Sequence, residues 1–487
     1  MKKWSEQRSP VLKPAAFVLA AALGMLSFTA CQPVVAEASA TPKVLNTVAA
    51  GETVQPPAAT DATITQAPQI PLAEYKAAGH WEEQVRDGKL TVNIGADILM
   101  PGVKSYPVVQ VEPLVMTQQE VDRLAGYFAA GGNKLYAYPE VKTKSDWWKI
   151  MDGYKAEYGD KAGDSMIAFY EEKISDAPES YQRKYTDTRL TYILDEYGDA
   201  LTDSGKNFLT VGVEDGNDGD TVIQVTNYNG NGYFTSFKYG RGMWYEKESV
   251  LAANPGISIE EYGAAQSAMD SVRISKEDAF ITAQKVLEDL AVKDMRLVNT
   301  EKASLISWEY KNYGSPETVT GGYVFEYFRE SGGIPAYGQW GLSNQDGNDM
   351  PDYIPPYGPE EIDILVSDEG VVFFYWHSRV KVVKTVTENA QLLPMDEIKE
   401  KLKAWIERKK EWYLQQEDVV DLTVWVDDAK LSIDVIEDEN EKGKALLVPV
   451  WVFGIRDTAN YAGYSGAYRA NSYMYVLNAL DGGTMPP

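Results

Sequence analysis

Side chains that commonly act as nucleophiles, general bases or zinc ligands are scarce in this chain. Its 487 residues include two histidines, His80 and His377, and a single cysteine, Cys31. A Ser–His–Asp triad or a zinc site would have to be built on one of these histidines. Alternation along residues 371–380 places His377 with Tyr375 on a mixed, partly exposed face. We therefore predict that the chain is not an enzyme and has no catalytic residue, no cofactor and no metal site.

Carboxylates are abundant, and two kinds of acidic chemistry stay open as alternatives. The segments EDGNDGD (214–220) and NQDGNDMPD (344–352) gather oxygen ligands that calcium prefers, but neither keeps the spacing of an EF-hand loop. The same composition is typical of turns between strands, which is the interpretation we favour. A pair of carboxylates could also hydrolyse a glycosidic bond. With 72 acidic residues, the sequence does not single out such a pair.

Cys31 lies where a thiol has a defined chemical use. Residues 1–13 carry four basic side chains and one acid, and the uncharged, largely apolar run 14–30 suits the hydrophobic region of a signal peptide. Small residues, Thr29 and Ala30, directly precede the cysteine. A thiolate at a new N-terminus is the nucleophile that can take up a lipid.

The order FTAC (28–31) resembles the lipobox of bacterial lipoproteins. The resemblance implies cleavage between Ala30 and Cys31, lipidation of Cys31, and removal of residues 1–30 as a lipoprotein signal peptide. Two alternatives remain: an ordinary signal peptide with an incidental cysteine, or an uncleaved anchor helix. In every case the remaining chain lies outside the cytoplasm.

The net charge of −26 limits the choice of partners. Such an acidic chain is repelled by nucleic acid and by anionic lipid head groups. We therefore expect no nucleic acid as a partner. The expected partners are the membrane, through a lipid on Cys31, and another protein of the cell envelope.

Composition divides the rest of the chain into four parts. Residues 31–71 are rich in Ala, Thr, Pro and Val and predict a disordered tether with a reach of roughly 35 Å. Residues 72–268 predict an N-terminal α+β unit, whose first helix is capped at Thr117 and whose hairpin centres on Asn229. Residues 269–390 and 391–487 each predict a helix followed by strands. The first helix is expected to begin at Ser275 and to bury a stripe that includes Ala283 and Leu287; the second is expected to begin near Pro394 and to bury a stripe that includes Leu402 and Ile406. The run GVVFFYWHSRVKVV (370–383) predicts the last strand of the first of these two units. The expected fold class is α+β, with antiparallel sheets and helices packed on one face.

Several segments of the C-terminal half resemble known extracytoplasmic domains. ISKEDAFITAQKVLEDL (274–290) is similar to the opening helix of PepSY-type domains. The YycI and YycH regulators are resembled by the segments 322–338, 360–380, 388–406, 445–454 and 473–483. The whole arrangement resembles an uncharacterised family of Gram-positive bacterial lipoproteins, a domain of unknown function. Regulators of this kind act by contact with sensor kinases, and the resemblance brings no catalytic residue.

These observations predict a lipid-anchored extracytoplasmic protein on the outer face of the cell membrane. Its expected function is non-enzymatic binding or regulation by protein–protein contact at the cell envelope. The alternative is a carbohydrate- or peptidoglycan-binding surface module, because aromatic side chains gather at Trp147, Trp148 and around Tyr464. A hydrolase with an acid pair is the third hypothesis.

Overall fold

The computed structural model describes residues 70–130, 133–192, 207–215, 221–228, 234–241, 244–253, 259–307, 318–337, 353, 355–463 and 468–485. All of these belong to one compact unit. The predicted signal peptide and nearly all of the predicted tether lie outside them. Within the described ranges, no helix is both long enough and apolar enough to span a bilayer.

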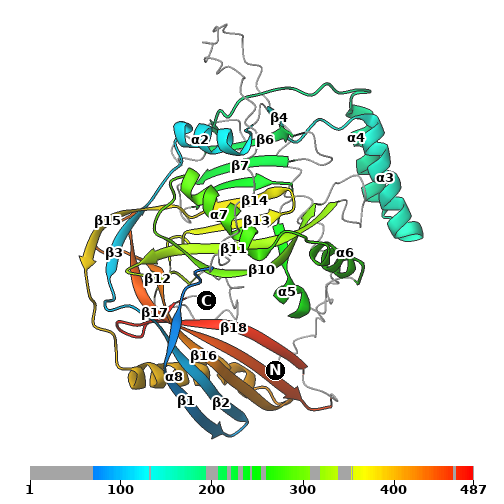
Figure 1. Ribbon diagram of the computed structural model, residues 1–487. Helices are drawn as coiled ribbons and strands as arrows, with labels where there is room; N and C mark the ends of the chain where they lie inside the picture. The colour runs from blue at the N-terminus through cyan, green and yellow to red at the C-terminus, as the bar shows by residue number, and fades with distance from the viewer. Residues whose placement is uncertain are drawn as a thin grey trace, which may run out of the picture. The chain divides into compact units, whose positions relative to one another are not determined.

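The fold is α+β, as the sequence predicts, and its strands form two largely antiparallel sheets (Figure 1). The eight-stranded sheet has the order β1-β2-β16-β17-β18-β19, with β3 pairing both β15 and β17. Its one parallel pair among the described strands joins β2 to β16. Its strands are β1 (Tyr75–Asp87), β2 (Leu90–Pro101), β3 (Val108–Pro113), β15 (Val380–Thr387), β16 (Val419–Glu437), β17 (Ala445–Tyr461), β18 (Tyr468–Asn478) and β19 (Thr484–Met485).

The eleven-stranded sheet has the order β4-β6-β7-β8-β14-β13-β11-β10-β9, with β12 paired to β11 and β5 to β6. It includes the predicted hairpin, because β7 pairs with β8. Its strands are β4 (Lys134–Ala137), β5 (Thr191–Tyr192), β6 (Asn207–Glu214), β7 (Thr221–Tyr228), β8 (Phe234–Gly240), β9 (Trp244–Lys247), β10 (Met295–Ser307), β11 (Thr318–Ser331), β12 (Ile334–Pro335), β13 (Glu361–Ser367) and β14 (Gly370–His377).

The helices begin where local capping chemistry favours them. Thr117 and Glu120 form the predicted capping box before α2, and Ser275 caps α7 by accepting from the backbone of Asp278. A second capping box, between Thr143 and Asp146, starts α3. The helices are α2 (Gln118–Phe128), α3 (Lys144–Tyr158), α4 (Asp164–Asp176), α5 (Glu248–Ala253), α6 (Ile259–Asp270), α7 (Lys276–Asp289) and α8 (Met395–Leu414), with a 3₁₀ turn η1 (Gly159–Lys161) after α3.

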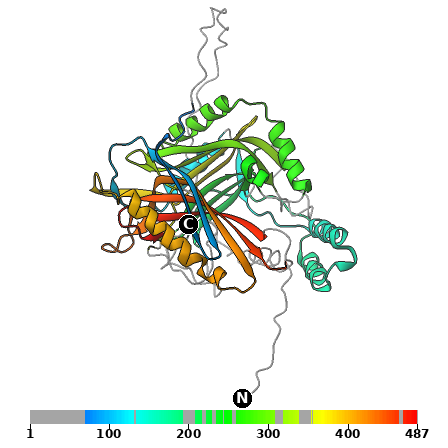
Figure 2. The ribbon, with the colours of Figure 1, turned by 90° about the horizontal axis from the view of Figure 1, so that it is seen from below.

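Each sheet buries one apolar face under helices. Helices α2 and α7 pack on the eleven-stranded sheet, where the predicted stripe of α7, including Ala283 and Leu287, joins the same core as Phe374. Helix α8 lies across the eight-stranded sheet (Figure 2) and buries its predicted stripe, including Leu402 and Ile406. The expected placement of helices on one face is therefore observed for both of these cores.

Strand pairing crosses the boundaries expected at residues 268/269 and 390/391. Strands β1, β2 and β3 come from the predicted N-terminal unit but join the C-terminal strands β16 and β17 in one sheet. The later part of the predicted N-terminal unit pairs instead with β10 and β14. The physical reason is that β2 and β16 each have a buried apolar face, and they cover the same core only when they lie side by side.

The predicted strand GVVFFYWHSRVKVV is two strands in different sheets. Strand β14 ends at His377, and β15 begins at Val380 in the other sheet. Between them, Ser378 has a φ of 52°, which turns the chain sharply. Strand β15 then pairs with β3 in the eight-stranded sheet, and the two strands run side by side (Figure 1).

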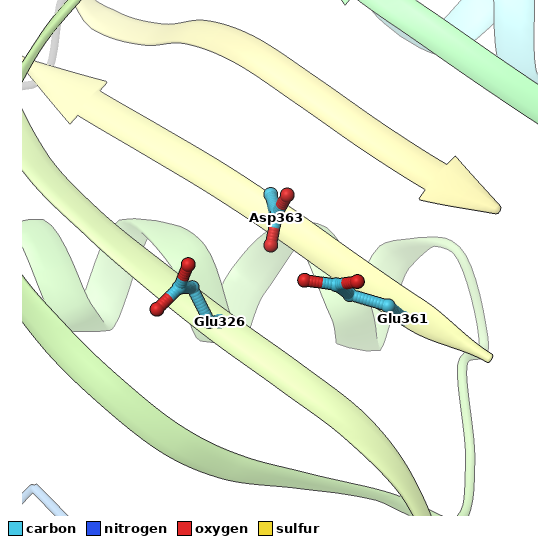
Figure 3. A group of neighbouring side chains, drawn as sticks. All are labelled: Glu326, Glu361 and Asp363. Atoms are coloured by element: carbon cyan, nitrogen blue, oxygen red, sulfur yellow. The ribbon is translucent and has the colours of Figure 1, made fainter. Parts of the chain in front are cut away.

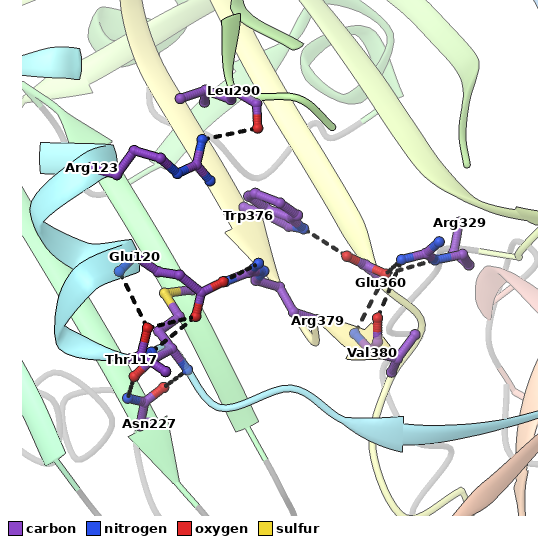
Figure 4. Close-up of polar contacts among 11 residues, drawn as sticks. Thr117, Glu120, Arg123, Asn227, Leu290, Arg329, Glu360, Trp376, Arg379 and Val380 are labelled. Carbon is purple, nitrogen blue, oxygen red and sulfur yellow. Dashed lines mark hydrogen bonds and ion pairs between the residues drawn. The ribbon is translucent and has the colours of Figure 1, made fainter. Parts of the chain in front are cut away.

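Buried ion pairs hold the chain where it passes between the sheets (Figure 4). We call Glu120, Arg329, Glu360, Trp376 and Arg379 the junction network. The Glu360 carboxylate accepts from Arg329 Nε at 2.7 Å and from Trp376 Nε1 at 2.9 Å. Arg379 donates to Glu120 at 2.9 Å and stacks on the Trp376 ring at 4.2 Å. The network thus joins α2, β11 and both ends of the crossing segment.

Candidate functional site

A row of polar side chains crosses the middle of the eleven-stranded sheet. The register pairs Asp363 with Glu326 on one side and with Tyr375 on the other. Ile362, Ile364 and Phe374 belong to the core under α2 and α7, so their sequence neighbours in this row lie on the opposite face. From β8 to β10 the row reads Lys238, Tyr375, Asp363, Glu326 and Asn299.

Three buried carboxyl groups form the centre of this face, and we call them the carboxyl cluster: Glu326, Glu361 and Asp363. One ligand atom from each lies within 4.8 Å of the others. Figure 3 shows the three groups converging from β11 and β13. Glu326 and Asp363 are 7% and 6% exposed, so the charges of this cluster are largely removed from water.

Glu326 is fully engaged by donors from the neighbouring strands. Its Oε1 accepts from Tyr245 at 3.0 Å and from the Lys247 ammonium at 2.9 Å. Its Oε2 accepts from Asn299 at 2.7 Å and from Lys247 at 3.2 Å. The Lys247 ammonium and the Glu326 carboxylate form an ion pair, and this pair anchors the edge strand β9.

Glu361 and Asp363 have an environment that disfavours ionisation. Burial raises the pKa of Glu361 to about 8, and the neighbouring Glu326 adds to the effect. Burial, followed by the charges of Glu361 and Glu326, raises the pKa of Asp363 well above its ordinary value. An oxygen of each side chain lies within 4.8 Å of an oxygen of the other and of Glu326, so ionisation of both groups would bring like charges together in a buried site.

His377 is buried, and the prediction of a partly exposed face was wrong. It is 5% exposed, and its Nε2 lies 2.7 Å from Oε2 of Glu361 on the adjacent strand. Burial lowers the pKa of His377, so the ring is neutral at pH 7. The predicted alternation is confirmed, because His377 and Tyr375 share a face and their rings stack with centroids 4.9 Å apart. The error lay in taking polar residues on a strand as a sign of exposure.

The carboxyl cluster does not fit a divalent cation. Calcium takes six to eight oxygen ligands, and magnesium requires near-octahedral coordination. Here the Lys247 ammonium already occupies the position beside Glu326, within 3.2 Å of both carboxylate oxygens. Placing a second cation next to that ammonium would be electrostatically unfavourable.

The other candidate residues lie far from the cluster in sequence and have separate environments. His80 is in β1, opposite Asp97 on β2, and its side chain is about half exposed. Trp147 packs against Phe169 and Tyr170 inside the α3–α4 hairpin, whereas Trp148 is 49% exposed. The residues Ala30, Cys31 and Tyr464, the segment 344–352 and most of 214–220 lie outside the described residues.

The carboxyl cluster was missed from the sequence, although each strand carries a signal. Glu326 interrupts the apolar run YVFEYF, and Asp363 interrupts IDILV. A single acid inside an otherwise buried strand is unusual and indicates a paired or protonated group. The pairing partners could not be identified, because register between strands depends on the whole sheet.

Comparisons with known proteins identify no family. No family model matches the chain, and no curated protein matches it. Among solved structures, an uncharacterized protein from Eubacterium rectale ATCC 33656 is similar over 82% of this chain and 92% of its own. The identity is 13% and the TM-score is 0.39.

Proposed function

We propose that the chain is a lipid-anchored extracytoplasmic protein that acts by non-enzymatic binding or regulation at the cell envelope. The observation that carries this proposal is the FTAC motif at Cys31, preceded by a basic segment and an apolar run. Its lipid would hold the body at the outer face of the membrane. The proposed partner is another envelope protein, because the strongly acidic chain disfavours nucleic acid.

The order of elements supports a relationship with PepSY-type and YycI/YycH-like regulators. Helix α7 is followed by the antiparallel strands β10, β11, β13 and β14, and α8 by β16, β17 and β18. Each half thus has the helix-then-strands order on which the resemblance rests. Regulators of this kind act by protein contact, which is the activity proposed here.

The chemistry of the carboxyl cluster also favours a non-enzymatic function. Glu326 accepts from Lys247, Tyr245 and Asn299, all within this chain. Glu361 contacts His377 and has an oxygen within 4.8 Å of an oxygen of Asp363. An acid pair for glycoside hydrolysis must instead direct its carboxyl groups at substrate.

Site-specific photocrosslinking in intact cells tests the proposal. Crosslinking residues at Trp148, Ile281 and Val386, which are 49%, 51% and 52% exposed, sample α3, α7 and β15. We expect a discrete protein adduct from at least one position, and the same adduct when the two purified proteins are mixed. Recovery of wall polymer alone would rule out the regulatory function.

The matched control is Cys31→Ala in the same cells. We expect this variant to lose incorporation of a fatty-acid analogue and to lose the crosslinks, because its body is no longer held at the membrane. Incorporation that persists in Cys31→Ala would show that the lipid is not on this thiol. The described body itself is unaltered by this substitution, so circular dichroism spectra should agree.

A carbohydrate-binding module is the second candidate, and Trp148 is the observation that favours it. Exposed aromatic rings can stack on sugars, and Trp148 is exposed on the α3–α4 hairpin. If glycan binding occurs, Trp148→Ala should abolish it on a glycan array without changing the melting temperature. Trp147→Ala is the matched control, because it should lower the melting temperature by removing packing against Phe169. Binding unaffected by Trp148→Ala would exclude this surface.

A further inference from the structure

The register of β11 and β13 brings two acids directly opposite each other. Glu326 pairs with Asp363 across these strands, and Glu361 lies two residues away on the same face. Like charges at directly opposed positions destabilise a sheet, and here both positions are buried. A sheet that closes over these groups therefore has to neutralise part of their charge.

The charged and titratable groups around the carboxyl cluster do not supply enough positive charge to balance three ionised carboxyl groups. Strand β9 contributes Lys247 and Tyr245, β10 contributes Glu301 and the uncharged Asn299, and β14 contributes His377 and Tyr375. From β8, Lys238 lies beyond Tyr375 in the same row. Among these contacts within the described residues, Lys247 is the cation that touches a carboxylate, and His377 is neutral. Three ionised carboxyl groups would thus face one bound ammonium.

The geometry of Asp363 indicates how the negative charge that Lys247 does not balance is neutralised. One of its carboxyl oxygens lies within 4.8 Å of an oxygen of Glu361 and of an oxygen of Glu326, and like charges this close in a buried site disfavour ionisation of both Glu361 and Asp363. Its Oδ1 is buried, and no hydrogen-bond partner is found for it among the described residues. Asp363 is therefore placed to hold the proton, while Glu361 lies beside Nε2 of His377.

We propose that Glu361 and Asp363 hold one proton between them, and that this proton acts as a pH-sensitive latch between β11 and β13. With the proton present, the cluster retains two negative charges, one of which is paired with Lys247. Loss of the proton restores like-charge repulsion between Asp363 and Glu326 and loosens the two strands. The raised pKa values of Glu361 and Asp363 agree with proton retention at pH 7.

The sign of the pH dependence follows from the raised pKa. Between about pH 4.5 and pH 8 the native state holds a proton that the unfolded chain has released, so stability falls as pH rises. One such proton changes the unfolding equilibrium constant by up to about tenfold per pH unit. Above about pH 8 this contribution levels off, because the native state has also lost the proton.

Equilibrium unfolding of the full chain as a function of pH tests the latch. Asp363→Asn permanently removes one of the three carboxyl charges, so no proton is needed. We expect the ratio of wild-type to variant unfolding constants to increase about tenfold per pH unit between pH 6 and pH 8. Glu361→Gln should show the same change in slope, and it provides the test if Asp363→Asn folds poorly. The control Asp97→Asn, at an exposed carboxyl group, should show no change in slope.

A second measurement locates the effect. Native-state hydrogen exchange at pH 6 and pH 9, corrected for intrinsic rates, should show loss of protection in β11 and β13 but not in β17 and β18. Asp363→Asn should abolish the difference. Equal slopes for wild type and both variants would overturn the proposal. Stabilisation of the wild type, but not of Asp363→Asn, by Mg²⁺, Ca²⁺, Mn²⁺ or Zn²⁺ would also overturn it, because the cluster would then be a metal site.

Discussion

Glu360→Ala should lower the free energy of unfolding by about 3–5 kcal/mol, because it removes the buried counter-ion of the Arg329 guanidinium and leaves only the exposed Asp294 at 3.5 Å. The Glu360 side chain is 1% exposed, and that of Arg329 is 11% exposed. The substitution also removes the acceptor of the Trp376 indole N–H. Chemical denaturation at pH 7, followed by tryptophan fluorescence, measures the change.

Two controls separate the loss of an ion pair from the loss of packing. The double variant Arg329→Met/Glu360→Met should recover most of the stability, since a buried pair can often be replaced by apolar side chains. Lys144→Ala should change stability by less than about 1 kcal/mol, because its partner Glu179 is 81% exposed. A loss below about 1 kcal/mol for Glu360→Ala would mean that the junction network is not an essential buried contact.

Asp434→Asn should raise the free energy of unfolding at pH 8 by about 2–4 kcal/mol. Burial within β16 raises the pKa of Asp434 to about 7, although its Oδ1 accepts from the backbone N–H of Val435 at 2.7 Å. The native state therefore holds a proton between about pH 4 and pH 7, and wild-type stability falls as pH rises through that range. An asparagine keeps the acceptor for Val435 and carries no ionisable group.

The pH profile distinguishes this effect from a general change in packing. Wild type and Asp434→Asn should have similar stability at pH 4, where Asp434 is protonated in the native state and only about half ionised in the unfolded chain, and should diverge up to about pH 7. Thermal unfolding at pH 4, 6 and 8 measures the divergence. A constant difference at all three values would show that the substitution acts through packing and not through the proton.

Elements specified by nearby residues could be predicted from the sequence. The capping groups at Thr117 and Ser275 start helices where expected, because a cap involves residues three positions apart. The apolar stripes of α7 and α8 are buried as predicted. Strand β1 was not predicted, since only Trp81 among its residues is buried and pairing with β2 holds the rest.

Features that depend on distant segments could not be predicted in the same way. The strand GVVFFYWHSRVKVV looks continuous in the sequence, but Ser378 divides it between two sheets. The eight-stranded sheet joins β2 to β16, although more than 300 residues separate them. Such pairing depends on which apolar faces can share one core, and the local composition of a strand does not identify the strand that pairs with it.

The sequence by itself determined the α+β class, the helix starts and the acidic character of the chain, and it predicts lipid attachment at Cys31. Each of these depends on composition or on a few consecutive residues. Only the tertiary structure placed Glu326 opposite Asp363 and buried His377 against Glu361. The physical reason is that strand register and burial set the distances and the desolvation of these groups, and both arise only when the whole sheet has closed.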